Sequence, residues 1–205
     1  TGVILHLLRH GQSVWNVEER VQGQTHHVPL TGTGVRQAEE ARDRLAGLPL
    51  AAILSSDQVR ARQTADVVAA AHALQVRETV LLREQGLGSL EGKHYGELEE
   101  EAPPEGVHVS EVRWGGGESL SDVAARLRIL VAGLRAEFAD SDQVLLVSHG
   151  DTLRVLVAIL DGGGHRDVDW VTYITWPNGH VETRALDAGE PGRAGRSEGT
   201  AEPAH

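Results

Sequence analysis

The chain contains no cysteine and no methionine, and aromatic residues make up only 3% of its 205 residues. The absence of cysteine excludes disulfide bonds, thiol nucleophiles and cysteine-ligated metals. The sequence also has no apolar run of about 18 residues, the length that a transmembrane helix requires. Its first residues lack the signal-peptide pattern of positive charge followed by an apolar stretch. These absences predict a cytoplasmic protein with no membrane partner.

Positive charge is scarce as well. The chain has 19 Lys and Arg residues against 30 Asp and Glu residues, which gives a formal net charge of −11. Nucleic acids and anionic membranes bind basic surfaces, so we expect neither as a partner. A protein this acidic binds an anion only through a local cluster of cations. Each arginine in a suitable position is therefore informative.

Short apolar runs alternate with amphipathic stretches along most of the chain. The apolar runs predict strands at residues 3–8, 51–55, 78–82, 143–147, 170–176 and 180–186. The helical spacing of apolar residues predicts helices at residues 31–47, 57–73, 119–138 and 152–160. Strands that alternate with helices are typical of α/β proteins. We therefore expect a three-layer α/β/α fold with a central, mostly parallel mixed sheet.

The composition divides the chain into a folded part and a tail. Residues 1–186 are long enough for one hydrophobic core, which predicts a single domain. Within that domain, residues 85–117 are irregular and rich in glycine, and we expect them to cover a pocket. Residues 187–205 are rich in Gly, Pro and Glu with almost no apolar side chains, which predicts disorder.

Polar side chains follow four of the predicted strands. In an open α/β sheet, ligands bind beyond the carboxyl ends of the strands. The residues at these ends or one turn into the next helix are Arg9, His10, Arg60, Glu84 and His149. Two arginines and two imidazoles around one point form a site for a tetrahedral dianion such as phosphate. The sequence has neither an HxH nor an HExxH metal motif, so an imidazole is the expected nucleophile in phosphoryl transfer.

A series of short motifs runs in order along the chain. They are Leu8–Ser13 with Asn16, Gln22–Gln24, Pro29–Thr31, Ser55–Asp57 with Arg60 and Gln63–Ala65, Leu82–Glu84, Leu90–Gly92, Gly116–Ser119 and Val147–Gly150. This series resembles the histidine phosphatase superfamily, in its phosphoglycerate mutase-like branch. The resemblance covers nearly the whole folded part. It implies that residues 1–186 form one catalytic domain with a phosphoglycerate mutase-like fold.

The resemblance implies a role for each matching residue. His10 corresponds to the nucleophile that becomes phosphohistidine, and Glu84 corresponds to the proton donor. The phosphoryl oxygens would be bound by Arg9, Arg60 and His149. The further substrate-binding positions would be Ser13, Asn16, Gln22, Gly23 and Gly150. The resemblance implies no cofactor and no metal.

Three other residues near these motifs are expected outside the reacting centre. Glu91 is the alternative acid, although we expect it to be structural. Trp15 is expected at the pocket edge and Arg62 on an exposed helix face. The chain departs from the family pattern at Leu90, where tryptophan is common, and at Trp176–His180, where the family has a small Asn-containing segment. The topology of residues 165–186 is therefore left open.

The charge of residues 85–117 favours a phosphatase over a mutase. A mutase must hold a doubly phosphorylated acid, which needs extra cations at the pocket mouth. This segment has only Lys93 and Arg113 as fixed cations, against seven glutamates. We therefore predict a metal-independent phosphomonoester hydrolase that acts on a small phosphorylated metabolite, with neutral or amine-bearing esters preferred.

Three alternatives stay open at this point. The first is cofactor-dependent phosphoglycerate mutase-type transfer. The second is a non-catalytic module that binds phospho-ligands. Such a module would not need His10 and Glu84, and the presence of both residues argues against it. The third is a metal-dependent hydrolase, which EDTA would inactivate. The sequence also leaves a homodimer open.

Overall fold

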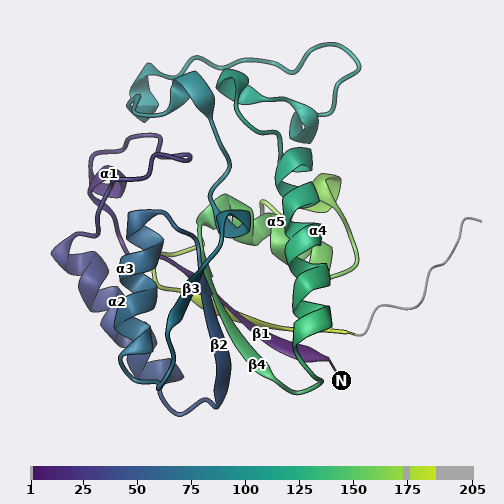
Figure 1. Cartoon of the computed structure of the whole chain (residues 1–205). Coiled ribbons are helices and arrows are strands. Elements are labelled where there is room, and N and C mark those ends of the chain that lie inside the picture. The colour runs from purple at the N-terminus through teal and green to yellow at the C-terminus, as the bar shows by residue number, and fades with distance from the viewer. Residues whose placement is uncertain (1, 173–175, 188–205) are drawn as a thin grey trace, which may run out of the picture.

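The computed structural model describes residues 2–172 and 176–187, and these residues contain a five-stranded sheet between two helical layers (Figure 1). The strands are β1 (Val3–Arg9), β2 (Leu50–Ser55), β3 (Val76–Glu78), β4 (Gln143–Ser148) and β5 (Val181–Leu186). Their order in the sheet is β3-β2-β4-β1-β5. Neighbouring strands among the first four run parallel, whereas β5 pairs antiparallel with β1. The predicted mostly parallel mixed sheet is confirmed.

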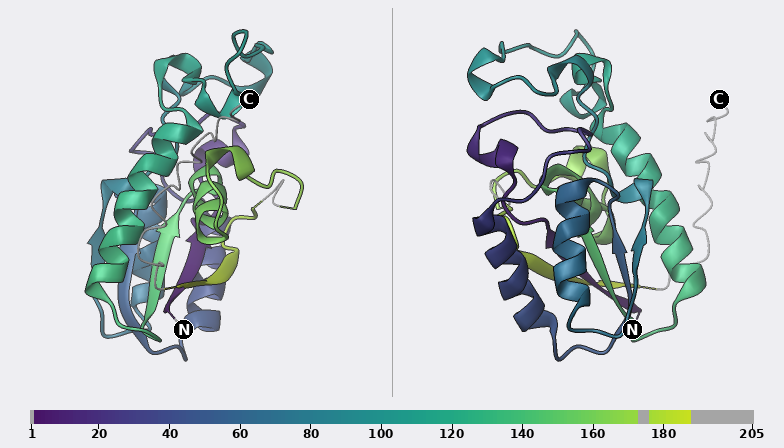
Figure 2. Two further views of the ribbon diagram at one scale, coloured as in Figure 1. Left: turned by 90° about the vertical axis from the view of Figure 1, so that its right-hand side faces the viewer. Right: turned by 60° about the vertical axis from the view of Figure 1, so that its left-hand side comes forward.

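Two helices cover each face of the sheet, which confirms the three-layer prediction (Figures 1 and 2). On one face lie α2 (Gly32–Leu45) and α3 (Val59–Ala69), which pack small residues such as Ala41 and Ala65 onto Ile53 and Leu145. On the other face lie α4 (Leu120–Glu137) and α5 (Gly150–Leu160), which pack around Leu146. Because successive strand residues point to opposite faces, Leu145 and Leu146 belong to different cores.

The remaining described elements are short. Helix α1 (Val14–Val17) follows β1. The single-turn 3-10 helices are η1 (Val80–Leu82), η2 (Gly88–Leu90), η3 (Tyr95–Glu97), η4 (Val109–Glu111), η5 (Trp114–Gly116) and η6 (His165–Asp167). Four of them, η2 to η5, lie in residues 85–117, which we call the covering segment. It lies beyond the carboxyl ends of the strands, at the top of Figure 1. Over the described ranges, no helix is both long enough and apolar enough to span a membrane.

Two of the predicted strands are wrong. The predicted strand at 78–82 is shifted, because β3 ends at Glu78 and η1 follows it. Thr79 starts that turn by accepting a hydrogen bond from the backbone N–H of Leu81 at 3.2 Å. In the predicted strand at 170–176, the described residues 170–172 form a turn, because Asp169 accepts bonds from the next N–H groups. Residues 173–175 and 188–205, with nearly all of the predicted tail, lie outside the described residues.

A close contact between two glycines joins the end of β1 to α2. A Cβ on Gly11 would lie 2.2 Å from the carbonyl oxygen of Gly34, and a Cβ on Gly34 would lie 2.0 Å from that of Gln12. Neither position has room for a side chain. The backbone N–H of Gly11 also donates to Thr64 Oγ1 at 3.0 Å. The residue that follows His10 is therefore fixed against both helices of this layer.

We predict that Gly34→Ala destabilises the protein, because the added methyl group would overlap a backbone carbonyl that has no room to move. The expected loss in the free energy of unfolding is about 1–3 kcal/mol. Gly133→Ala is the matched control, since Gly133 lies exposed in α4 with nothing near its missing Cβ. That change should stabilise the protein by about 0.5–1 kcal/mol through helix propensity. Urea denaturation measures both, and equal effects would contradict the proposed contact.

Candidate active site

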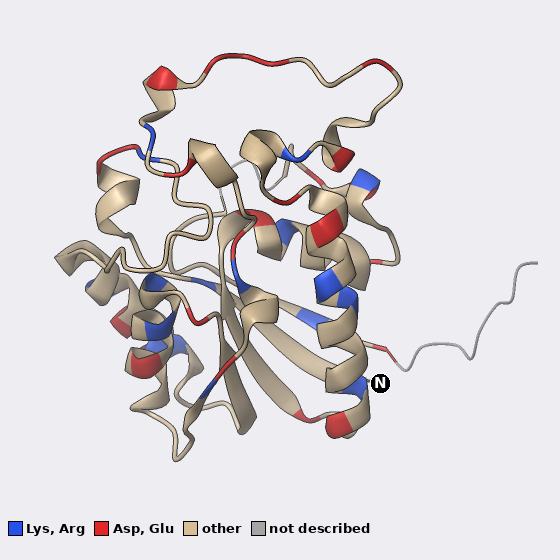
Figure 3. Ribbon diagram, turned by 45° about the horizontal axis from the view of Figure 1, so that its top comes forward, with Lys and Arg blue, Asp and Glu red and all other residues tan. Residues whose placement is uncertain are grey.

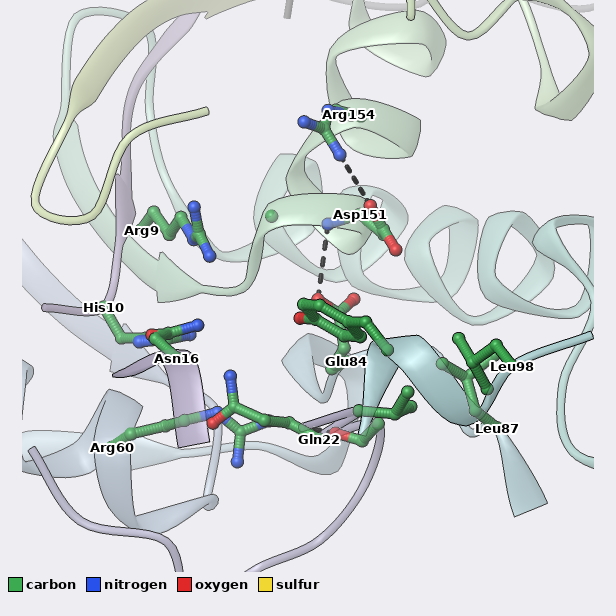
Figure 4. Close-up of a pocket in the computed structure, with 14 residues that line it drawn as sticks. Arg9, His10, Asn16, Gln22, Arg60, Glu84, Leu87, Leu98, Asp151 and Arg154 are labelled. Atoms are coloured by element: carbon green, nitrogen blue, oxygen red, sulfur yellow. Dashed lines mark hydrogen bonds and ion pairs between the residues drawn. The ribbon is translucent and has the colours of Figure 1, made fainter. Parts of the chain in front are cut away.

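The carboxyl ends of β1 and β4 and the start of α3 meet beneath the covering segment at a cavity of about 390 Å³ (Figure 4). Its lining residues are Arg9, His10, Asn16, Val21, Gln22, Gly23, Arg60, Glu84, Leu87, Tyr95, Leu98, Gly150, Asp151 and Arg154. The structure thus brings together most residues that the sequence singled out. Figure 4 shows Arg9, His10 and Arg60 on one side of the cavity, with Glu84 and Asp151 opposite them.

His10 has one ring nitrogen engaged and the other available. Its Nδ1 lies 2.6 Å from the carbonyl oxygen of Gly11. A carbonyl only accepts, so Nδ1 carries the proton and Nε2 carries the lone pair. The pKa of His10 lies well below its ordinary value because the ring is buried and because Arg60 and Arg9 repel a second positive charge. His10 is therefore neutral near neutral pH, the state that a nucleophile requires.

His149 lies beside His10, just behind the cavity wall. The two ring centroids are 5.1 Å apart, and the Nε2 of His149 is 2.8 Å from Ser56 Oγ. Its Nδ1 is buried, with no hydrogen-bond partner among the residues described. Burial and the charge of Arg60 lower the pKa of His149 well below its ordinary value. A buried ring nitrogen without a partner is costly unless a ligand meets it.

Arg9 and Arg60 are buried cations that have no carboxylate in salt-bridge contact within the described ranges. Arg60 is held by backbone carbonyls, since its two terminal nitrogens donate to Thr25 at 2.8 Å and to Gly23 at 2.9 Å. Arg9 donates to the carbonyl of Trp176. The Nε of each arginine is buried and has no described partner. Burial lowers the pKa of Arg60 to about 10, so the group stays charged near neutral pH. Buried cations arranged in this way favour an anionic ligand.

Glu84 is fixed at the amino end of α5. Its Oε1 accepts from the backbone N–H and the hydroxyl of Thr152, each at 3.1 Å, and from the N–H of Gln85 at 2.9 Å. Its Oε2 accepts from the N–H of Asp151 at 3.3 Å. The predicted proton donor thus faces the cavity from the side opposite His10 (Figure 4).

Asp151 and Arg154 line the cavity, although sequence reasoning missed both. Asp151 Oδ1 pairs with Arg154 Nη1 at 2.6 Å. Desolvation and the negative charge of Glu84 raise the pKa of Asp151 to about 6. Their position in the sequence could have predicted a place in the cavity, because Asp151 directly follows His149 and Gly150 at a helix start and Arg154 lies one turn later. Four other lining residues that the sequence analysis did not single out have no such signal: Val21, Leu87, Tyr95 and Leu98.

Ser13, which was expected to bind substrate, and Trp15, which was expected at the pocket edge, do not line the cavity. Asn16 and Gln22 line the cavity, but Ser13 is fully buried and does not. The hydroxyl of Ser13 donates to Gln22 Oε1 at 2.6 Å and also contacts Asn16. Ser13 therefore orients the two amides. Trp15 does not line the cavity either, and its ring meets that of His27 edge-on at 5.8 Å.

Two further polar residues stabilise the surroundings of the cavity. Glu91 accepts from the backbone N–H of Gln24 at 2.7 Å and of Leu87 at 3.0 Å, so it joins two loops. Arg62 points away from the site and pairs with Asp66 and Glu78 on the outside of α3. These positions are those that the sequence analysis expected.

The unusual segment Trp176–His180 supports the end of β1, where Arg9 and His10 lie. The backbone N–H of Gly179 donates to the carbonyl of Arg9 at 3.0 Å. The side-chain amide of Asn178 donates to the carbonyl of His10 at 3.1 Å. Trp176 is fully buried, and its carbonyl accepts from Arg9. The residues that depart from the family pattern are therefore those that hold Arg9 and His10 in place.

Comparisons with known proteins agree with this geometry. Residues 5–190 match the model of the histidine phosphatase superfamily, branch 1. The chain belongs to the histidine phosphatase superfamily. A curated relative, the probable phosphoglycerate mutase GpmB of Klebsiella pneumoniae, is 35% identical over 168 residues, which are 77% of this chain and 74% of the relative.

Solved structures of this superfamily share the fold. A mycobacterial glucosyl-3-phosphoglycerate phosphatase in complex with VO3 is similar with a TM-score of 0.77 and 34% identity, over 88% of this chain and 90% of that one. YhfR of Bacillus stearothermophilus has a TM-score of 0.70 and 28% identity over the same shares of the two chains. In the described part of this chain, no three His, Cys, Asp or Glu side chains are grouped so that they could hold a metal ion.

We predict that Arg60→Lys weakens the binding of inorganic phosphate by about a hundredfold, because lysine cannot reproduce a planar fork held by two carbonyls. Arg62→Lys is the control, since it makes the same chemical change two residues along α3 on the outer face. It should leave the affinity unchanged. Isothermal titration calorimetry measures both constants, and thermal unfolding verifies that both variants are folded. Equal affinities for the two variants would show that Arg60 does not contact the anion.

Proposed function

We propose that this histidine phosphatase is a metal-independent phosphomonoester hydrolase that acts on a small phosphorylated metabolite through a phosphohistidine at His10. The main support is the pair of buried guanidinium groups, Arg9 and Arg60, beside a neutral imidazole. These cations can hold the phosphoryl oxygens, which is the charge-neutralising task that a metal ion performs in other phosphatases.

The first step would transfer the phosphoryl group to the enzyme. The lone pair on Nε2 of His10 attacks phosphorus, a nitrogen–phosphorus bond forms and the ester oxygen–phosphorus bond breaks. Arg9, Arg60 and His149 would stabilise the charge on the equatorial oxygens. The protonated carboxyl of Glu84 would give its proton to the departing alkoxide. The bond from Nδ1 of His10 to the carbonyl of Gly11 keeps the ring oriented throughout.

The second step would release phosphate. Glu84, now a carboxylate, takes a proton from water while the water oxygen attacks phosphorus and the nitrogen–phosphorus bond breaks. The acid and base roles thus alternate on one side chain. A mutase would instead deliver the same phosphoryl group to a second hydroxyl.

The charge around the cavity favours water over a second phosphorylated acid as the acceptor. Arg154 is the remaining cation among the lining residues, and its charge is balanced by Asp151. Acidic residues outnumber basic ones along the covering segment (Figure 3). The name of the mycobacterial neighbour also supports hydrolysis. The names of curated relatives such as GpmB favour the mutase reaction, which is the second candidate.

We predict that His10→Ala lowers phosphatase activity by about a thousandfold or more, because no nucleophile is left. His72→Ala, beyond the far end of α3, should keep full activity. The assay uses p-nitrophenyl phosphate with and without EDTA, and bisphosphoglycerate as a mutase substrate. Acid-labile phosphoenzyme should form on the unchanged protein and not on His10→Ala. Activity of His10→Ala near that of the unchanged protein would exclude the phosphohistidine, and activity lost in EDTA would indicate a metal-dependent hydrolase.

We predict that Glu84→Gln affects substrates according to their leaving groups. The kcat/KM for an alkyl phosphate should fall by about a hundredfold or more, because an alkoxide must be protonated as it departs. The kcat/KM for p-nitrophenyl phosphate, which does not include the later attack of water, should fall by less than about tenfold, since nitrophenolate departs without a proton. Glu91→Gln, which affects a loop contact, should reduce both to the same degree. Equal losses for both substrates in Glu84→Gln would assign the proton to another acid.

A further inference from the structure

The part of the cavity beyond the phosphoryl site has a different chemistry. Arg9, His10 and Arg60 occupy one side, whereas the opposite wall carries Glu84 and Asp151 (Figure 4). This second region must hold the alcohol part of a substrate, because the phosphoryl oxygens occupy the cationic side. Its chemistry therefore determines which esters the enzyme accepts.

Asp151 faces this region with a fixed orientation. Its Oδ1 is bound to Arg154, and the Arg154 guanidinium also lies over the ring of Trp170, 5.2 Å from the centroid. Arg154 is thus engaged on two sides. The Asp151 side chain keeps 36% of its surface exposed within the cavity wall, and Oδ2 accepts no hydrogen bond from any described residue. A carboxylate oxygen therefore remains for a ligand.

The covering segment supplies an aromatic ring to the same region. Tyr95 lines the cavity and is half-exposed. Desolvation raises the pKa of its hydroxyl the most. Arg9 opposes this shift, whereas Asp151 and Glu84 add to it, so Tyr95 lies near all three charged side chains. The aliphatic side chains of Leu87 and Leu98 complete this wall. A carboxylate beside an aromatic ring in an apolar surround is the chemistry that binds an ammonium group.

We propose that Asp151 determines substrate specificity and that the preferred substrates are phosphate esters of amino alcohols, whose ammonium group binds Asp151. The proposal rests on the proposed phosphatase function. The backbone N–H of Asp151 donates to Glu84 Oε2 at 3.3 Å, so the two residues are neighbours. An ammonium group bound to Asp151 would therefore lie close to the ester oxygen that Glu84 protonates. A carboxylate on the alcohol would instead meet like charge from Asp151.

The test compares two esters of nearly equal shape, phosphoethanolamine and n-propyl phosphate, by their kcat/KM values. The unchanged enzyme should prefer phosphoethanolamine by about tenfold or more, the effect of one charge-assisted hydrogen bond. Asp151→Asn should reduce this ratio to nearly one. Asp161→Asn is the matched control, because it removes the same charge at the other end of α5, where Asp161 pairs with Arg184. Its ratio should equal that of the unchanged enzyme.

A second measurement needs no variant. The raised pKa of Asp151, about 6, means that the carboxylate becomes neutral in acid. The ratio of the two kcat/KM values should therefore fall toward one between about pH 7 and about pH 5. The ammonium group makes the phosphate of phosphoethanolamine more acidic than that of n-propyl phosphate, so each kcat/KM is first corrected for the measured fraction of phosphate dianion. The charged and titratable groups that face Asp151 are Glu84, Arg154, Arg9 and Tyr95. They also act on the ammonium group, so the same pH series on Asp151→Asn shows which part of the change belongs to Asp151.

The outcomes separate this proposal from the proposed function. Turnover of p-nitrophenyl phosphate with no preference for phosphoethanolamine would overturn the role of Asp151 and leave the phosphatase function intact. A preference that Asp151→Asn and acid both leave unchanged would also overturn it. No turnover of any ester would instead refute the phosphatase function itself.

Discussion

Burial of two arginine side chains without a carboxylate in salt-bridge contact is the constraint on which the site depends. Arg9 and Arg60 are held by backbone carbonyls, and neither is in salt-bridge contact with an acid in the described structure. The chain has 30 acidic residues, so acidic partners for these arginines are plentiful in the sequence. Buried unpaired charge destabilises a fold, so an arrangement of this kind is typical of a ligand site. An anion that binds there supplies the missing charge.

Burial and the same two cations together affect the state of His10. Burial lowers the pKa of His10 the most, because it penalises the charged imidazole, and repulsion from Arg60 and Arg9 lowers that pKa further. The imidazole that we propose as the nucleophile is therefore neutral while its surroundings are cationic. One arrangement of charge thus suits the proposed phosphoryl site and keeps the proposed attacking nitrogen unprotonated.

The scaffold holds these groups by backbone contacts from several directions. The glycine contact between Gly11 and Gly34 fixes the end of β1 to α2, and Trp176–His180 fixes the other side of the same residues. Glu84 is held by the amino end of α5. These supports come from segments far apart in the chain. The covering segment contributes apolar and aromatic side chains instead, which suits the alcohol-binding region that we propose.

The sequence by itself determined the layered α/β fold, the strand-end positions of Arg9, His10 and His149, and the acidic character of the covering segment. These features depend on local periodicity and on short motifs, which a single chain displays directly. The prediction of a strand at 78–82 was wrong, because the Thr79 hydroxyl accepts a hydrogen bond from the N–H of Leu81 and starts a 3-10 turn directly after β3.

Only the tertiary structure decided which residues share the cavity. Tyr95 and Leu98 enter it because the covering segment packs over the strand ends, and no periodicity in the sequence encodes that approach. The tertiary structure also assigned Ser13 to orienting Asn16 rather than lining the cavity, since its hydroxyl points into a local cap. Motifs identify the reacting groups, whereas contacts between distant segments define the space that the substrate occupies.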